Sequence, residues 1–134
     1  ALLTDAGLSQ HVKWVPPLPI TPFERMCRSC DVVADQFKLG AFGGVCFKAM
    51  AVGAPILTYL KEALLLQQYP EVPPVINCEF SEEIVSRLGN LVARSEELER
   101  MGMASREWMK KYHGKAATVN AQVDQFRLHL PVGA

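Results

Sequence analysis

A glycine-rich stretch, residues 38–50 with the sequence KLGAFGGVCFKAM, holds the groups best suited to bind a ligand. Gly40, Gly43 and Gly44 allow the backbone to take positive φ or to approach a bound molecule closely. The apolar residues after Gly43 predict a short buried helix, whose first amides lack partners and lie at the positive end of the helix dipole. Amides in that position bind anions, and a diphosphate is the usual occupant.

The glycine spacing is also compatible with a tight turn that binds nothing. It matches neither the G-x-G-x-x-G of dinucleotide-binding folds nor the P-loop with its Lys-Ser/Thr pair. A strand-to-helix turn without a ligand therefore stays open as an interpretation of the residues alone. The anion site also requires that no side chain of the protein itself occupies the amides at the start of the Gly43 helix.

Two of the four cysteines, Cys27 and Cys30, form a C-x-x-C motif. A redox dithiol would lie at a helix N-terminus, where the dipole lowers the thiol pKa. This pair instead closes a predicted helix at its C-terminal end, on the apolar face, so we expect both thiols to pack in the core. A zinc site would need two further ligands, whereas Cys46 and Cys78 stand apart from each other. Thiols in apolar contexts are typical of reduced cysteines, so we expect a cytoplasmic protein.

The three histidines lack the Ser and Asp partners of a catalytic triad. His113 ends a predicted helix, where a cation suits the dipole, so we expect a capping or surface residue rather than a general base. Trp108 lies on the apolar face of the same helix and is expected to anchor the core.

Short apolar runs that alternate with helical patterns would position the glycine-rich loop. Strands are predicted at residues 11–15, 31–35, 55–59 and 74–78. Such alternation implies βαβ crossovers and a parallel sheet with both faces covered. The loop would then follow a strand at the carboxyl edge of the sheet, where ligands of such folds bind. The sequence predicts an α/β, Rossmann-like fold, with a parallel sheet of about four strands and flanking helices, in a single domain over residues 1–134.

Capping residues mark where the helices are expected to begin. The first of them should have Thr21 as N-cap, Pro22 in the first helical position and Glu24 completing a capping box. Ser81 and Ser95 each begin a further helix with glutamates in its first turn. A last amphipathic helix carries four apolar residues, Val119, Val123, Phe126 and Leu130.

Composition excludes several classes of partner. The chain has 134 residues, of which 49% are hydrophobic, and this is long enough for one core. Its net charge of zero argues against a nucleic-acid groove or an anionic membrane surface, since both need clustered Lys and Arg. No apolar run approaches the roughly 20 residues of a membrane span. We therefore expect no nucleic-acid partner and no membrane span.

Residues 29–60, SCDVVADQFKLGAFGGVCFKAMAVGAPILTYL, resemble the donor-binding half of GT-B glycosyltransferases of the large retaining family 4. Members typically show an apolar strand, a glycine-rich loop and then "fG…lEAmA.GkPvi". The resemblance continues through the strand and helix of residues 73–92 and the helix of residues 97–113. It implies the C-terminal half of a GT-B fold with a site for a nucleotide-diphosphate sugar. Enzymes of this type generally need no bound metal, and the donor is a substrate rather than a cofactor.

The resemblance also implies which residues would meet the donor. The diphosphate and the sugar would lie against four consecutive residues, Phe42, Gly43, Gly44 and Val45. Their backbone amides would bind the anion and stabilise charge on the departing diphosphate.

The family commonly carries two glutamates spaced E-x7-E, and here those positions are Gly40 and Lys48. A lysine has donors only, so Lys48 cannot accept hydrogen bonds from ribose hydroxyls. It could extend to solvent, which we favour, or reach back to a phosphate. Gly40 removes a sugar contact, although the polar pair Asp35 and Gln36 could lie nearby instead.

The acceptor-binding domain of a GT-B enzyme, and the first strands of its donor domain, have no counterpart in these 134 residues. Half of a cleft cannot orient two substrates, so we expect no transferase activity from this chain alone. The leading hypothesis is a nucleotide-diphosphate-sugar-binding module of a hexosyltransferase, active only when the N-terminal domain is supplied. The alternative is a non-catalytic, Rossmann-like interaction domain derived from a glycosyltransferase, which could self-associate through the edge where the first strands would pack.

Overall fold

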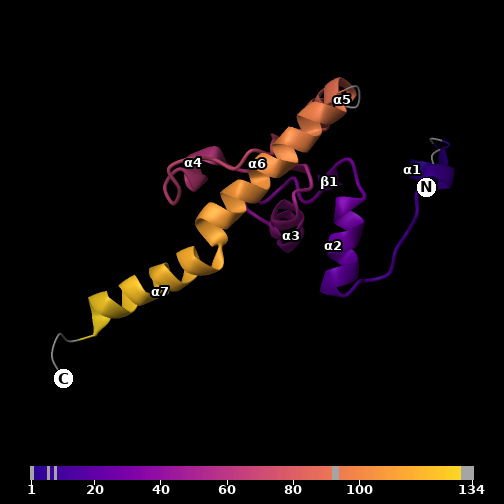
Figure 1. The fold of residues 1–134 in the computed structure, drawn as a ribbon. Helices are drawn as coiled ribbons and strands as arrows, with labels where there is room; N and C mark the ends of the chain where they lie inside the picture. The colour runs from indigo at the N-terminus through magenta and orange to yellow at the C-terminus, as the bar shows by residue number, and fades with distance from the viewer. Residues whose placement is uncertain (1, 6, 8, 92–93, 131–134) are drawn as a thin grey trace.

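The computed structural model describes residues 2–5, 7, 9–91 and 94–130. Its elements, in chain order, are α1 (Leu2–Asp5), the 3-10 turn η1 (Ser9–His11), α2 (Ile20–Arg28), β1 (Val33–Ala34), α3 (Gly44–Val52), β2 (Ile56–Thr58), α4 (Glu62–Leu65), β3 (Ile76–Asn77), α5 (Ser81–Leu91), α6 (Ser95–His113) and α7 (Lys115–His129). The three strands form one parallel sheet in the order β1-β2-β3, with helices packed around it (Figure 1). The described part of the chain is therefore a mixed α/β fold in which helix predominates.

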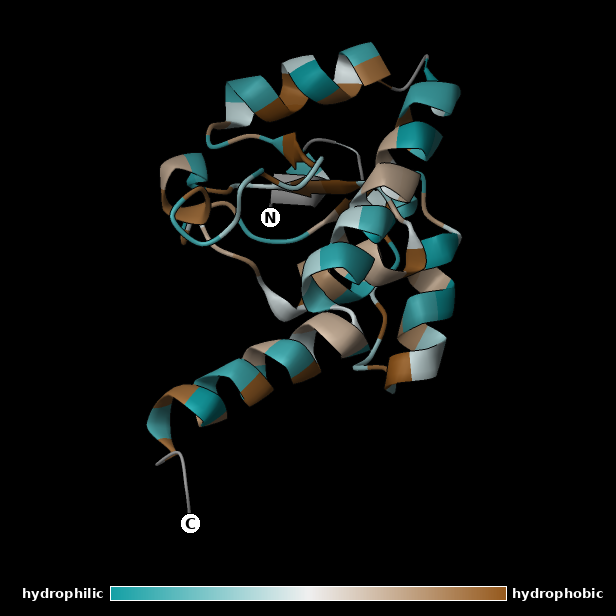
Figure 2. Ribbon diagram, turned by 60° about the vertical axis from the view of Figure 1, so that its left-hand side comes forward, coloured by the Kyte–Doolittle hydropathy of each residue, from teal (hydrophilic) through white to brown (hydrophobic). Residues whose placement is uncertain are grey.

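The central strand β2 is buried on both faces and separates two apolar clusters. Successive side chains of a strand point to opposite faces, so Ile56 and Leu57 enter different clusters. Ile56 packs with residues of α2, α3 and the second half of α6, including Trp108, which is 3% exposed. Leu57 packs with residues of β3, α5 and the first half of α6. Figure 2 shows the apolar strands lying between the helices.

The turn from α3 into β2 follows directly from the sequence Gly-Ala-Pro. Gly53 takes the left-handed conformation, with φ of 80°, and ends α3. Its N–H donates to the Met50 carbonyl at 3.0 Å, and the Ala54 N–H donates to the Ala49 carbonyl at 3.0 Å. This pairing of the last helical carbonyls is the Schellman arrangement. Pro55 then cannot continue the helix, and β2 begins at the next residue.

A second glycine, Gly102 in α6, allows that helix to pack closely on the end of α3. A Cβ built at Gly102 would overlap the Gly53 carbonyl oxygen and lie 3.2 Å from Cδ of Pro55. Gly102 is buried, so the two helices meet there through backbone atoms. The close approach fixes α6 across the α3–β2 turn.

Three expectations about the N-terminal third of the chain are wrong. Residues 12–19 form no strand and are exposed, with Trp14 85% exposed, so the sheet has three described strands rather than four. The helix over residues 20–28 exists, but its N-cap is Pro19 and no side chain caps it, so the box at Thr21 is absent. Of the C-x-x-C pair, Cys27 is buried as expected, whereas Cys30 lies beyond the helix and is exposed.

The last helix, α7, forms, but it ends before Leu130 and packs no residue into the core, so the apolar face expected of it has no partner within the described residues. All of its described side chains except that of Ala117 are exposed, and Phe126 is 65% exposed. It leaves α6 at Gly114 and extends away from the rest of the structure (Figure 1). None of the helices in the described ranges has the length and apolar content needed to cross a bilayer.

Candidate functional site

The loop between β1 and α3 lies at the carboxyl end of β1 and is organised by one amide side chain. Nε2 of Gln36 donates to the carbonyls of Ala41, at 2.6 Å, and Tyr59, at 3.2 Å. Its Oε1 accepts from the N–H groups of Lys38, at 3.0 Å, and Leu39, at 2.7 Å. Gln36 thus uses its polar atoms inside the loop, and it is not a free sugar ligand.

A glycine is required at position 40 because the backbone turns there with positive φ and the Lys61 side chain packs over it. Gly40 has φ of +66° and is buried, and its carbonyl accepts from the Lys61 N–H at 2.9 Å. A Cβ at this position would lie 2.5 Å from Cγ of Lys61, so the lysine stem closes over the glycine. The structure therefore places Gly40 beneath protein atoms rather than at an open surface.

Gly43, the N-cap of α3, faces the carboxylate of Asp35. Oδ2 of Asp35 accepts from the Cys46 N–H at 3.2 Å, so one amide of the first turn is already paired within the protein. A Cβ at Gly43 would overlap that carboxylate, whose Oδ1 would be 2.7 Å away. The absence of a side chain at Gly43 thus has a reason within the fold, and the expectation that the helix start is free of protein side chains fails for the Cys46 amide.

The amides of Gly44 and Val45 remain available, as do those of Phe42 and Gly43, which likewise donate to no acceptor within the described ranges. The Gly44 and Val45 N–H groups begin α3 and donate to no acceptor among the described residues. Gly44 is exposed, and a Cβ built there would meet no protein atom within 4 Å. Of the two glycines at the start of α3, Gly44 is the one around which the fold leaves open space.

The side chains of Phe42 and Lys48 point into contacts with other helices. The Phe42 ring packs against Phe47, with centroids 4.8 Å apart, and against Trp108, at 5.7 Å. Nζ of Lys48 lies 5.7 Å from the centroid of the Phe23 ring on α2, a cation–π contact. Lys48 is exposed, and this contact directs its ammonium group toward α2.

Burial and nearby carboxylates shift the pKa of two side chains at this edge of the sheet. Burial raises the pKa of the Cys46 thiol to about 12, and the negative charge of Asp35 adds to the effect, so Cys46 stays protonated and unreactive. Burial also raises the pKa of Tyr59, with a further contribution from the carboxylate of Glu79 and its hydrogen bond to the phenol. Within the described ranges no three His, Cys, Asp or Glu side chains are grouped closely enough to hold a metal ion.

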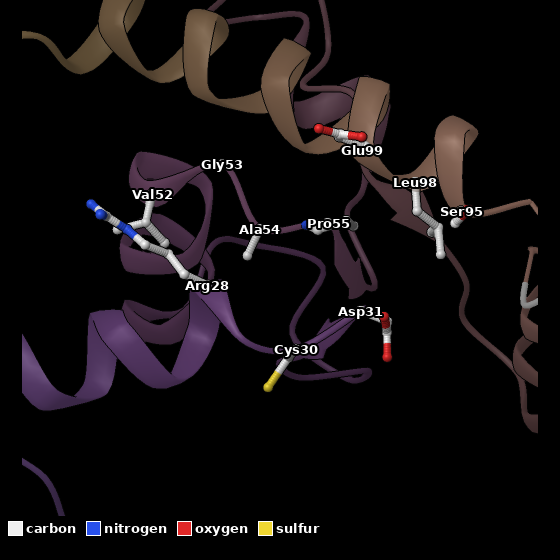
Figure 3. A pocket seen from close by; sticks show the side chains of 10 residues that line it. All are labelled: Arg28, Cys30, Asp31, Val52, Gly53, Ala54, Pro55, Ser95, Leu98 and Glu99. Carbon is white, nitrogen blue, oxygen red and sulfur yellow. The ribbon is translucent and has the colours of Figure 1, made fainter.

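A hollow of about 240 Å³ opens at the other edge of the sheet, near the amino ends of β1 and β2 (Figure 3). Arg28, Asp31 and Glu99 line it together with the backbone around Pro55. Because parallel α/β sheets bind ligands beyond the carboxyl ends of their strands, this hollow is on the unfavourable side. It is separate from the Gly44–Val45 surface.

The sequence predicted the loop and α3 correctly but did not indicate two side-chain contacts that matter there. The contact of Asp35 with Gly43 joins residues on either side of the intervening loop. The sequence indicates this contact only through the position of Asp35, an acidic residue directly after a strand and before the start of a helix. His113 was expected at a surface or a cap, yet it is half-buried, and its Nε2 lies 3.1 Å from the Tyr69 hydroxyl. Nothing in the local pattern KKYHG indicates that contact.

Comparison of the chain with protein families, with curated proteins and with solved structures finds no match.

Proposed function

We propose that this chain is a nucleotide-diphosphate-sugar-binding module, the Rossmann-like donor half of a GT-B hexosyltransferase. The observation that carries the proposal is the start of α3, which follows the carboxyl end of β1 and where the Gly44 and Val45 amides donate to no acceptor within the described ranges. Unpaired amides at a helix start attract phosphoryl oxygens through hydrogen bonds and through the helix dipole. In a complete enzyme the same amides would stabilise the charge of the departing diphosphate.

Asp35 limits how the donor can be oriented. Two like unit charges 4 Å apart repel by about 4 kcal/mol at an effective dielectric constant of 20, so a phosphoryl group beside this carboxylate would be disfavoured. A carboxylate is, however, an acceptor for hydroxyl donors. The proposed pose therefore places the diphosphate on the Gly44 and Val45 amides and a hydroxyl of the sugar on Asp35.

Gly44 offers a clean test of this pose. A side chain at Gly43 would collide with Asp35, so a loss of binding there would have two causes, whereas a side chain at Gly44 meets no protein atom. We expect Gly44→Val to weaken binding of UDP-glucose or GDP-mannose at least tenfold in calorimetry, with the thermal midpoint changed by only a few degrees. Gly89→Val is the matched control, because Gly89 also has open space around it but lies in α5. Absence of binding by both nucleotide sugars to the folded chain would refute the proposal.

Asp35→Asn separates the two parts of the pose. The amide can still accept from the Cys46 N–H through its Oδ1, so α3 keeps its cap while the negative charge is lost. We expect tighter binding of UDP alone, because the repulsion is removed, and a smaller affinity advantage of UDP-glucose over UDP. An unchanged advantage would show that the sugar does not contact Asp35.

A non-catalytic interaction domain is the second candidate, and the exposed apolar side chains of α7 favour it. Val119, Val123 and Phe126 on that helix, and Leu130 directly after it, are all exposed. Under this alternative, nucleotide sugars would not bind, and light scattering would show a mass that rises with protein concentration. Phe126→Ser would then restore the monomer mass.

A further inference from the structure

Six rings form one cluster at the end of α6, which we call the His113 cluster: Phe42, Phe47, Tyr69, Trp108, Tyr112 and His113. The imidazole lies within it, with its centroid 5.0 Å from Phe47, 5.5 Å from Trp108 and 5.6 Å from Tyr69. The Phe42 ring follows at 6.5 Å, in an edge-on arrangement. The cluster thus joins α6 to the loop before α3 and to α3 itself.

Two members of the His113 cluster bracket the open start of α3 in the chain. Phe42 directly precedes Gly43, and Phe47 comes two residues after Val45. Their rings contact each other and His113. These contacts link the position of the imidazole to the position of the first turn of α3. The Gly44 and Val45 amides lie between these two anchored positions.

The surroundings of His113 favour its neutral form. Tyr69 and Tyr112 are the other titratable side chains of the cluster, and the Tyr69 hydroxyl is the hydrogen-bond partner of Nε2. The carboxylate bonded to this cluster is that of Glu71, which accepts from Lys111 at 2.8 Å and from Tyr112 at 2.9 Å. Phe42 and Phe47, from the loop and from α3, bring no charge. Burial therefore lowers the pKa of His113, because an imidazolium here would lose water and gain no anionic partner.

We propose that His113 is a positioning residue of the nucleotide site, which in its neutral form holds Phe42 and Phe47 so that the Gly44 and Val45 amides face the diphosphate. This inference rests on the proposed function. Protonation brings a charge among the rings and favours states in which the imidazole moves to water. The two phenylalanines then lose a packing partner, and the start of α3 loses its fixed position. Nucleotide-sugar affinity should accordingly fall on acidification.

The size of the effect has an upper bound. A histidine with the ordinary pKa of about 6.5 would be about nine-tenths protonated at pH 5.5, which would reduce the binding-competent fraction about tenfold. Since burial lowers the pKa of His113, the loss of affinity between pH 7.5 and pH 5.5 should be at most tenfold. UDP-glucose is a suitable probe because both of its phosphoryl groups stay ionised throughout this range.

The experiment follows nucleotide binding and the histidine separately in one protein. The chain has two tryptophans, and Trp14 is exposed in an irregular segment, so Trp14→Phe leaves Trp108 as the single tryptophan, which can be excited selectively over the tyrosines. An imidazolium beside an indole quenches its fluorescence, so Trp108 emission reports protonation of His113 without any ligand. Calorimetric titrations with UDP-glucose over pH 5.5 to 7.5 then show whether affinity follows the same midpoint.

His113→Gln supplies the decisive comparison. Glutamine has no titration in this range, and its side-chain amide can accept from or donate to the Tyr69 hydroxyl. We expect this variant to bind more weakly than the parent at pH 7.5, because the ring that packs on Phe42 and Phe47 is gone, and to lose most of the further fall in affinity between pH 7.5 and pH 5.5. His129→Gln, on the exposed helix α7, should leave both the affinity and its pH profile unchanged.

The possible results distinguish this inference from the function on which it rests. If UDP-glucose binds and the pH profile of affinity is the same in His113→Gln as in the parent, the inference is overturned while the proposed function stands. If Trp108 fluorescence titrates with pH but the affinity for UDP-glucose does not change with the same midpoint, the inference is likewise overturned and the proposed function stands. If the folded protein binds no nucleotide sugar at any pH, the proposed function fails and the inference fails with it.

Discussion

The close approach of α6 to the α3–β2 turn predicts a loss of stability when Gly102 gains a side chain. Gly102→Ala would place a methyl group against the Gly53 carbonyl oxygen, with the Gly53 carbonyl carbon 3.1 Å away. These are backbone atoms, and the Gly53 turn is held by its own hydrogen bonds, so α6 must move instead. Forced overpacking of this kind costs typically about 1–3 kcal/mol, and we take about 3 because the obstacle is backbone. Alanine offsets about 1 kcal/mol through its higher helix propensity. The net expectation is a loss of about 2 kcal/mol.

Gly89→Ala is the control for that substitution. Gly89 lies in α5 and is exposed, and a Cβ built there would meet no atom within 4 Å, so only the propensity gain remains. We expect this variant to be up to about 1 kcal/mol more stable than the parent. Urea unfolding followed by circular dichroism should show midpoints that move in opposite directions, with a slope that is unchanged. Equal midpoints for the two variants would refute the claim that α6 contacts the turn through Gly102.

Three further outcomes follow from other contacts. Cys30 should react with a thiol reagent in the native state before the three buried cysteines, which should need unfolding, and mass spectrometry of the labelled peptides checks this. Ser105→Ala should cost about 1–3 kcal/mol in urea unfolding, because the buried hydroxyl donates to the Pro74 carbonyl and its loss leaves that acceptor unpaired. The hydrogen bond from Lys111 lowers the pKa of Glu71, and a second hydrogen bond from the Tyr112 hydroxyl adds to the effect. The ionised carboxylate therefore stabilises the native state above the ordinary carboxyl pKa, and this stabilisation is lost as the pH falls through the lowered pKa. Glu71→Gln should therefore show a smaller drop in thermal midpoint between pH 5 and pH 3 than the parent shows.

The elements that were predicted well are those whose boundaries are determined by residues adjacent in the sequence. The run from Asp31 to Thr58 contains a strand, a helix and a second strand, and the Gly53 turn separates the last two. Short-range rules suffice there, because positive φ at a glycine and the blocked helix at a proline act within a few residues. The starts of α5 and α6 at Ser81 and Ser95 were also predicted, although Ser81 is the first helical residue rather than the N-cap that the sequence suggested.

The errors concern features that depend on distant parts of the chain. HVKWV at residues 11–15 has a strand-like composition, but a strand forms only beside a partner, and none of the described strands pairs with it. The carboxylate of Asp35 reaches the amide of Cys46 through the fold of the intervening loop, which local patterns do not define. His113 similarly enters a cluster built from residues as distant as Phe42 and Tyr69. The sequence therefore predicted one part of the candidate site, namely Gly44 and the helix that it begins. The side-chain contacts of Asp35 and His113 next to that part depend on tertiary packing and could not be predicted locally.

The side chain of Gln36 has a consequence for how any molecule could be recognised at this loop. Four hydrogen bonds from a single amide hold the backbone in shape before a ligand arrives. Association would then order few additional torsions, so its entropic penalty should be small and its rate close to that of simple docking. A rigid receptor of this kind selects ligands by shape, because it cannot adapt to those that do not fit.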